Sequence, residues 1–306
     1  MDPRRYQIAA LTALVAYGLF GLNFDARPSV AATLFVTAIA VQWCGWRVVF
    51  SGSTRTDYKS AIISALSLCL LLRTSSLLVA AVAAALTISS KFIIRVGGKH
   101  VFNPTNFGIV AALLLTSSAW VSPGQWGDAA FFAFLVACVG IVVVTRAARA
   151  DVTITFLFAY ATLLVARSLW LGEPLTIPLH RLQNGALLIF AFFMISDPKT
   201  TPDARVGRIV FAVIVALGAY YVHFRLFRPN GLLWSLAAAS PLVPLIDSVH
   251  GGCHVQAETW SHRLRSALVR GSVVRLVRAP GGLLRVLRVP GGHEAVQPRV
   301  AGRAGP

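Results

Sequence analysis

Two polar stretches in an otherwise apolar chain carry the residues that could bind a ligand or a cofactor. The first stretch, residues 97–108, contains a Gly-Gly pair that permits a sharp turn and an Asn-Pro pair that predicts an extended residue followed by a helix start. The N-terminus of that helix, beside a lysine, could hold an anion. The same pattern fits a capped loop whose lysine and histidine only face lipid headgroups. The residues concerned are Lys99, His100, Asn103 and Pro104, with Thr105 and Asn106 as capping residues.

The second polar stretch, residues 196–208, directly follows a short apolar segment and begins Ser-Asp-Pro-Lys. A break there would direct backbone carbonyls and the Asp197 carboxylate into the protein. Irregular backbone at membrane depth is tolerated only where it is buried or lines a cavity. The alternative is a polar cytoplasmic hairpin in which Asp203 and Arg205 are solvated. We favour a functional role for Asp197, with Pro198 beside it.

Other familiar chemistries are excluded by the sequence. The predicted spans contain no Asp or Glu, so the row of buried carboxylates that marks a proton-relay pump is missing. There is no Walker loop, Ser-His-Asp pattern or HExxH motif. The cysteines are too scattered for a disulfide framework or a zinc site, and three histidines fall at segment ends rather than at ligand spacing. These residues are Cys44, Cys69, Cys138 and Cys253, and His180, His223 and His250.

Composition predicts an integral membrane protein. The chain has 306 residues, of which 56% are hydrophobic and 13% charged, and its mean hydropathy is +0.70. Soluble domains carry about 25% charged residues. The net charge of +17 comes from short basic clusters between long apolar runs, which is the pattern of membrane loops rather than of a nucleic-acid-binding face.

Ten apolar segments are predicted to cross or enter the membrane. About 20 residues span its hydrocarbon core, so the shorter segments must be buried in protein or extended by flanking residues. The segments are Tyr6–Leu22, Val30–Val49, Ala61–Leu72, Leu77–Ile88, Phe107–Trp120, Ala129–Val144, Ile154–Leu169, Ala186–Ile195, Ile209–Val222 and Gly231–Ile246.

The ten segments divide into two sets of five, over residues of about 1–120 and 128–247. Because five is odd, the second set enters the membrane from the opposite side. In each set the third segment, Ala61–Leu72 or Ala186–Ile195, is unusually short and ends in polar residues. Interrupted spans at matching places in two inverted halves point to a binding site near the membrane midplane. The alternative is two short helices that neighbouring helices shield.

Basic residues predict the orientation of these segments. With the N-terminus in the cytoplasm, the inner loops hold 13 Lys and Arg and the outer loops hold 6. This asymmetry follows the positive-inside rule. We therefore expect a membrane domain over residues 1–250 in a bacterial inner membrane, with both termini cytoplasmic.

Three segments taken together resemble the NqrB/RnfD family, the membrane subunits of sodium-pumping NADH:quinone reductase and of the Rnf electron-transport complex. They are Lys99–Pro104, Gly185–Pro198 with the Gly-Arg pair at 207–208, and Pro244–Asp247. Their order and spacing agree with the family over residues of about 55–250.

The resemblance implies ten helices in two inverted repeats, an all-α fold related to urea transporters. It also implies a flavin, electron transfer linked to ion movement within a larger complex, and, in the NqrB branch, contact with quinone. By carry-over, Gly185, Ala186, Asp197 and Pro198 would lie near the cofactor site. The equivalent region of the first half would contain Lys99, His100, Asn103 and Pro104.

One departure from the family concerns covalent flavin. Members that bind FMN covalently use a threonine in a Ser-Gly-Ala-Thr-like motif between the fifth and sixth spans. Here that loop, residues 120–128, contains no threonine, and the lead into the eighth segment keeps only Gly-Ala. We therefore expect a noncovalent flavin, FMN or riboflavin, or no cofactor.

Residues 251–306 form a basic tail rich in Arg, Pro and Gly. The tail holds 9 arginines against Glu258 and Glu294, and it repeats an Arg-rich unit that ends in Pro-Gly-Gly. It is expected to be disordered, or alternatively to lie on anionic lipid. Nucleic-acid binding is not expected, because stacking aromatic residues other than Trp260 are missing from it.

The leading functional prediction is a membrane subunit of an electron-transport complex that couples electron transfer to ion translocation. It would work with partner subunits in the lipid bilayer, and it carries no nicotinamide or iron–sulfur motif of its own. The alternative is a solute channel or transporter on the same scaffold without redox chemistry.

Overall fold

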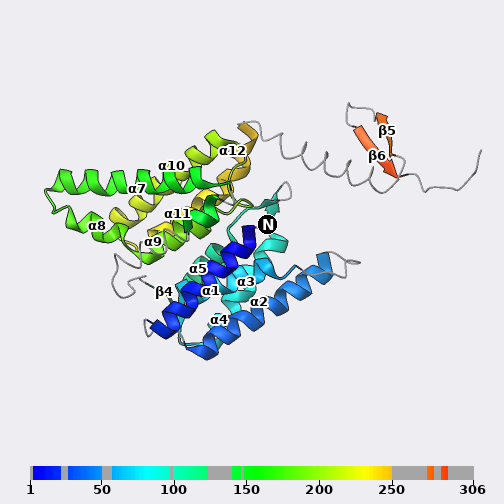
Figure 1. Ribbon diagram of the computed structural model, residues 1–306, viewed down its shortest axis with the longest axis horizontal. Coiled ribbons are helices and arrows are strands. Elements are labelled where there is room, and N and C mark those ends of the chain that lie inside the picture. The colour runs from blue at the N-terminus through cyan, green and yellow to red at the C-terminus, as the bar shows by residue number, and fades with distance from the viewer. Residues whose placement is uncertain are drawn as a thin grey trace, which may run out of the picture. The chain divides into compact units, whose positions relative to one another are not determined.

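The computed structural model describes residues 3–21, 27–49, 57–96, 99–122, 140–145 and 148–249, with two strands beyond them, 274–278 and 284–288. The chain divides into two units, Met1–Gly252 and Cys253–Pro306. The first unit is built from helices that pack on one another (Figure 1).

Long apolar helices dominate the first unit. Four stretches have the length and composition to cross a membrane: α2 (Pro28–Val49), α7 (Ala150–Leu171), α10 (Arg205–Phe224) and the run Gly231–Val249. That run comprises α11 (Gly231–Ala239), a 3-10 turn (Ser240–Leu242) and α12 (Val243–Val249). The fold is therefore that of a mostly helical membrane protein. The remaining helices are α1 (Pro3–Gly21), α3 (Lys59–Leu71), α4 (Leu77–Ile93), α5 (Pro104–Leu115), α8 (Thr176–Leu182) and α9 (Gly185–Ile189), which continues as the π-helical turn Phe190–Met194.

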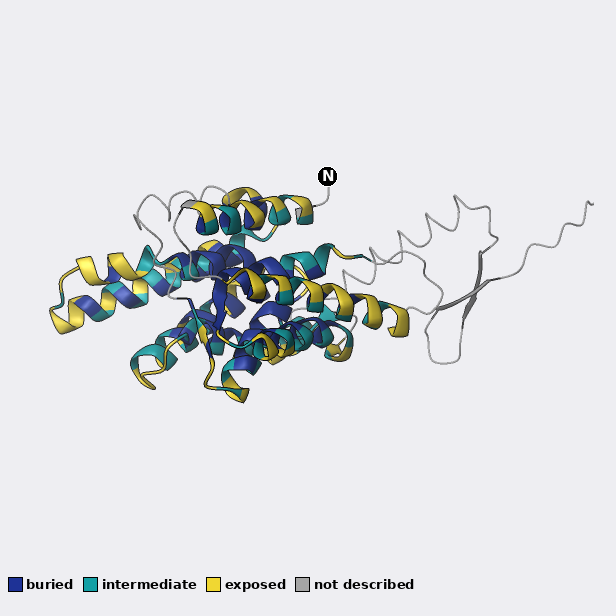
Figure 2. Ribbon diagram, turned by 90° about the horizontal axis from the view of Figure 1, so that it is seen from below, coloured by how far each residue is buried: buried dark blue, intermediate teal, exposed yellow. Residues whose placement is uncertain are grey.

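The two short apolar segments singled out in the sequence are the most deeply buried helices. They are α3 and the continuous helix Gly185–Met194, which we call the broken helix because it changes from α to π geometry at Phe190. Residues 64–74 and 187–196 are buried without interruption. A helix that is apolar all round belongs inside a protein, and here the longer helices cover it (Figure 2).

The predicted segment Phe107–Trp120 is shorter than expected. Helix α5 ends at Leu115, and Ala119–Val121 forms strand β4, which pairs antiparallel with β1 (Leu72–Thr74). The Ser122 N–H extends this pairing by donating to the Leu71 carbonyl at 2.7 Å. Helices α3 and α5 both end here, so their last backbone groups need partners that lipid cannot supply. The all-α expectation is wrong in this respect, because short strands supply those partners.

A second strand pair positions the first polar stretch. Strands β2 (Arg95–Val96) and β3 (Lys99–His100) form a hairpin between α4 and α5. The Val101 N–H donates to the Ile94 carbonyl at 3.2 Å and closes it. Lys99 and His100 are thus held at the entrance to α5 by backbone pairing.

Two further expectations concern segments that the structure describes only in part, the predicted segment Ala129–Val144 and the tail. Of the segment Ala129–Val144, only residues from 140 onward are described, and these are helical. In the second unit, β5 (Val274–Arg278) and β6 (Leu284–Arg288) pair antiparallel and coincide with the two Arg-rich repeats. For the rest of the tail, disorder stays a prediction.

Close packing of α5 on α4 depends on Gly108. A Cβ at this position would lie 1.7 Å from Thr87 Oγ1 and 2.9 Å from the Ala83 carbonyl oxygen, both on α4. Small residues let helices in membranes approach this closely.

We expect Gly108→Val to destabilise the protein by about 2 kcal/mol, because α4 and α5 must separate to admit the side chain. The measurement is thermal unfolding in detergent. Ala40→Val, at an exposed position of α2, is the control and should stay within about 0.5 kcal/mol of wild type. Equal melting temperatures for both variants would contradict the close approach.

Candidate functional site

The structure divides the predicted site residues between two cavities. A cavity of about 300 Å³, which we call the Asp197 cavity, is lined by five of them: His100, Asn103, Pro104, Asp197 and Pro198. Ala186 instead lines a cavity of about 160 Å³, the Ala186 cavity, and Gly185 is buried next to it. The two sets lie at opposite ends of the broken helix.

Both halves of the unit contribute to the Asp197 cavity. The first half supplies α1, α3, the β2–β3 hairpin and the start of α5, and the second supplies the end of the broken helix and the turn after it. Apolar walls come from Ile63, Val143, Phe193 and Met194. Hydroxyl groups come from Ser60, Ser64, Ser67 and Thr105, and positive charge from Arg4 and Lys199. The cavity thus combines apolar faces with converging polar groups, as small-molecule sites do.

Asn103 joins the two halves at this cavity. Its Oδ1 accepts from the Asn106 N–H at 3.1 Å and caps α5, a role that the sequence analysis had assigned to Thr105 and Asn106. Its Nδ2 donates to the Met194 carbonyl at 3.3 Å and to Asp197 Oδ2 at 3.4 Å. One buried amide therefore caps the start of α5 and the end of the broken helix together.

Asp197 is held by the turn that it begins. Its Oδ1 accepts from the Lys199 N–H at 3.0 Å, and its backbone carbonyl accepts from Thr200 and Thr201. Burial raises the pKa of the Asp197 carboxyl above its usual range, against the opposing effects of the Lys199 N–H and of the charges on Lys199 and Lys91. Burial therefore favours the protonated form of this carboxyl more than it is favoured in an exposed aspartate.

His100 presents an unpaired atom. Burial, with the charges of Lys199, Arg95 and Lys91, lowers the pKa of His100 to about 4, so the ring is neutral at pH 7. The ring hydrogen-bonds the backbone of Lys91, while Nδ1 is buried and has no hydrogen-bond partner among the described residues. Unpaired buried polar atoms are costly, which suggests that a ligand completes this one.

Lys99 does not line the cavity. Its ammonium group contacts two carboxylates of the second half, Asp203 Oδ1 at 2.6 Å and Asp247 Oδ2 at 3.0 Å, and also the Thr201 carbonyl at 3.3 Å. The lysine that the sequence offered to an anion is thus paired within the chain. We call this arrangement the Lys99 clamp, because it ties the β2–β3 hairpin to the turn after the broken helix.

The clamp belongs to a larger charged network that the motifs did not reveal. Asp247 Oδ1 accepts from the Asp203 N–H at 2.8 Å. Asp151 pairs with Arg208 through Nη2 at 2.6 Å, and Arg208 donates to the Asp203 carbonyl. The resemblance had drawn attention to Asp247 and Arg208, but Asp151 carried no signal in the sequence. This network fixes the turn that carries Asp197.

The Ala186 cavity is built around the start of the broken helix. Asn184 caps it, since its Oδ1 accepts from the Ala186 N–H at 2.8 Å and the Leu187 N–H at 3.4 Å. Arg181 and His223 contact each other at the cavity wall, and Tyr160 also lines it. Between the two cavities, residues 187–196 are apolar apart from Ser196 and entirely buried.

The fold and these cavities define a class: a helical membrane protein with one cavity at each end of a short buried helix. A model of the NQR2, RnfD, RnfE family matches residues 115–252, which include the broken helix and Asp197. This match confirms the resemblance to the NqrB/RnfD family.

Curated relatives point the same way. Over 160 residues the chain is 27% identical to the RnfD subunit of the ion-translocating oxidoreductase complex of Erwinia tasmaniensis, covering 52% of this chain and 40% of that protein. It is 30% identical over 124 residues to the protein of the same name from Cronobacter sakazakii (40% and 34%). It is 29% identical over 102 residues to that of Escherichia coli K12 (33% and 29%). The chain spans about two fifths or less of the length of these relatives.

The Lys99 clamp yields a first prediction. Lys99→Met should destabilise the protein by about 2 kcal/mol, because two carboxylates lose their shared cation. The figure is below that of a fully buried pair, since these side chains are 16–25% exposed. Adding Asp247→Asn should recover part of the loss. Thermal unfolding measures both, and Arg205→Met, at an exposed position nearby, is the control. A Lys99 variant as stable as that control would show that the Lys99 ion pairs do not contribute to the stability of the fold.

His100 yields a pH prediction. Its folded pKa of about 4 lies below the unfolded value of about 6.5, so its stabilising effect is complete above pH 6.5. As the pH falls from 6.5 to 4, protonation favours the unfolded chain and stability should drop by roughly 1–3 kcal/mol. His100→Asn should flatten this part of the melting-temperature profile, and His180→Asn, at an exposed position, should not. Parallel profiles for both variants would refute the assignment.

Proposed function

We propose that the chain is a membrane subunit of an electron-transport complex of the RnfD/NqrB type, coupling electron transfer to ion translocation across a bacterial inner membrane. The relatives are named as a component of an ion-translocating oxidoreductase complex, which supports this. The family match over residues 115–252 covers the second half of the proposed site. The electron donor and acceptor would be bound by other subunits of the complex, with quinone as one acceptor.

The observation that carries the redox proposal is the Asp197 cavity. Its volume of about 300 Å³ lies at the lower end of the range of small-molecule sites, about 300–1,000 Å³. The apolar side chains of Ile63, Phe193 and Met194 could face a flat ring. The unpaired His100 Nδ1 offers a hydrogen-bond partner, as do Asn103 and Asp197.

These residues fit an isoalloxazine ring. A bound flavin would supply one- and two-electron redox chemistry. Asn103 and Asp197 would orient it, the apolar walls would exclude water, and Asp197, with its raised pKa, would hold or release a proton at its carboxylate. The flavin, riboflavin or FMN, would be held noncovalently, since the 120–128 loop has no threonine.

The finer architecture belongs to the same proposal. Residues 1–250 would form ten helices in two inverted five-helix repeats, over about 1–120 and 128–247, and both termini would be cytoplasmic. The burial of α3 and of the broken helix at corresponding places in the two halves supports the repeat. The basic tail, residues 251–306, would lie on the cytoplasmic side.

A solute channel on this scaffold is the second candidate. It is favoured by one observation, the presence of a cavity at each end of the same short helix. The uninterrupted apolar burial of residues 187–195 opposes it, because polar solutes need polar partners along their path.

A visible spectrum of the detergent-purified protein separates the two candidates. We expect flavin absorption that acid precipitation releases into the supernatant. Asn103→Ala and Asp197→Ala should each lower flavin occupancy at least about tenfold, because each loses hydrogen bonds to the ring. Asn184→Ala, which removes the corresponding cap at the Ala186 cavity, should keep its flavin.

Other outcomes of this experiment are equally informative. Flavin retained in the precipitate would mean covalent attachment and contradict the noncovalent site. Folded wild-type protein without flavin would move the assignment to the channel. Flavin that all three variants retain would place the cofactor outside the Asp197 cavity.

A further inference from the structure

A buried lysine lies behind the wall of the Asp197 cavity. Lys91, near the end of α4, is only 4% exposed, and its ammonium group donates to Ser60 Oγ at 3.2 Å. It forms no ion pair within the described part of the chain. Ser60 lines the cavity, whereas Lys91 does not. The ammonium group is thus one hydrogen bond away from the space that we assign to a ligand. We call these two residues the Lys91–Ser60 pair.

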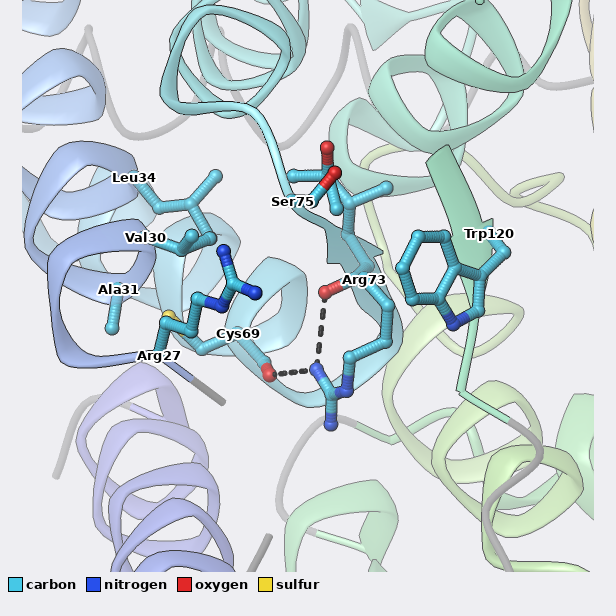
Figure 3. Close-up of a pocket in the computed structure, with 10 residues that line it drawn as sticks. Arg27, Val30, Ala31, Leu34, Cys69, Arg73, Ser75 and Trp120 are labelled. Carbon is cyan, nitrogen blue, oxygen red and sulfur yellow. Dashed lines mark hydrogen bonds between the residues drawn. The ribbon is translucent and has the colours of Figure 1, made fainter. Parts of the chain in front are cut away.

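The partners of a buried cation indicate what it does, because its removal from water must be repaid. Arg73 and Lys91 are the buried basic side chains among the Lys and Arg residues that the structure describes. Arg73 donates to backbone carbonyls at the end of α3, which carry the negative end of the helix dipole (Figure 3). Lys91 has a neutral hydroxyl as its described hydrogen-bond partner. Its charge can therefore act on a negative group beyond Ser60.

A second contact of Lys91 also leads to the cavity. Its backbone hydrogen-bonds the ring of His100, the side chain whose Nδ1 is buried and unpaired. Ser60 and His100 come from α3 and β3, and both line the cavity. One residue of α4 therefore supports two polar groups on the cavity wall.

The hydroxyl group of Ser60 can donate into the cavity. Because Ser60 Oγ accepts from the lysine, its own hydrogen needs another acceptor, and the described residues supply none. A hydroxyl that accepts from a cation is polarised, and it donates more strongly to an oxygen that carries negative charge. The Lys91–Ser60 pair is thus suited to an acceptor oxygen of a ligand.

Two helix N-termini favour negative charge at the same place. Ser60 lies in the first turn of α3, which has 13 residues, and Pro104 and Thr105 lie in the first turn of α5, which has 12. All three residues line the cavity. The partial positive charge of a helix start acts within this first turn. Asp197 is the one carboxylate among the described lining residues, and burial favours its protonated form.

We propose that the Lys91–Ser60 pair donates a charge-assisted hydrogen bond to a carbonyl oxygen of the ring in the Asp197 cavity and raises its redox potential by stabilising the negative charge that reduction adds. This inference rests on the proposed function, because it takes the ring to be a flavin. Protein charges near a flavin ring tune its electronics.

The proposed roles of the two residues differ. Ser60 would contact the ring, and Lys91 would be a positioning residue that acts through Ser60. Reduction adds two electrons from the donor of the complex and one proton from water, so the neutral ring gains one negative charge. The Lys91–Ser60 pair itself exchanges neither electrons nor protons.

The test is a spectroelectrochemical titration of the full chain, purified in detergent with its flavin, at about pH 6, where the Lys91 ammonium group is protonated. Lys91→Met keeps the length of the side chain and removes the charge. It should lower the ratio of reduced to oxidised flavin at a given potential by at least about tenfold, which is about 30 mV for a two-electron couple. Arg95→Met removes a charge at an exposed position and is the matched control. It should keep the wild-type potential, because water and salt screen that charge.

Ser60→Ala tests whether the lysine acts through the hydroxyl group. It should lower the flavin potential to a similar extent. The double variant with Lys91→Met should have a potential no lower than that of the lower single variant, since independent effects would add. Ser89→Ala, on α4 and outside the cavity lining, is the control for loss of a hydroxyl.

Stability separates this role from a purely structural one. Lys91→Met replaces a buried ammonium group by an apolar side chain of similar length, so the melting temperature should not fall. A lower melting temperature with an unchanged flavin potential would make Lys91 a structural residue and overturn the proposal.

The remaining outcomes distinguish this inference from the flavin assignment. Wild-type potentials in Lys91→Met and Ser60→Ala, with flavin retained, would overturn the role of the pair and leave the flavin in place. Additive shifts in the double variant would show that the two residues act separately. An equal shift in Arg95→Met would indicate a general charge effect. Folded wild-type protein without flavin would refute the proposed function and this inference with it.

Discussion

Every helix that ends inside this protein must find partners for its last backbone groups, and the rest of the structure depends on that constraint. At the end of α3, the Arg73 guanidinium donates to the Cys69 carbonyl, and the residues after it pair as β1 with β4. The broken helix starts on Asn184 and ends on Asn103. Lipid offers no hydrogen bonds, so such ends can exist only where neighbouring segments supply them.

The Asp197 and Ala186 cavities lie beside these capped helix ends, because a helix that ends inside the protein leaves space next to its cap. Asn103 fills two roles at the Asp197 cavity, since it caps α5 and also reaches Met194 and Asp197. The charged network behind it, from Lys99 to Asp203 and Asp247, keeps the turn of the second half against the hairpin of the first. The cavity is therefore rigid on the protein side, which favours a ligand held by shape and a few hydrogen bonds.

Local chemistry could be predicted from the sequence, and distant pairings could not. The Asn-Pro pair at residues 103–104 is itself a local signal for a helix start, and the start of α5 was predicted correctly. The end of α5 at Leu115 was missed because β4 pairs with β1, and no local pattern reveals a partner so far away. Lys99 was taken for a ligand-binding residue, since its partner Asp247 lies 148 positions further along the chain. Ala186 and Asp197 were both placed near the cofactor site by the family resemblance, and the structure puts them in different cavities at the two ends of the broken helix.

The apolar stretch between the two cavities has an electrical consequence. The broken helix has ten residues, so it extends about 15 Å, half of the roughly 30 Å hydrocarbon thickness. A cavity filled with water carries the potential of the adjoining solution inward, so the voltage across a membrane would fall mainly over this stretch. Moving one charge from one cavity to the other would then cross nearly the full potential, worth about 2.3 kcal/mol per 100 mV. The electric field across the membrane would therefore be concentrated over the short buried helix between the two cavities.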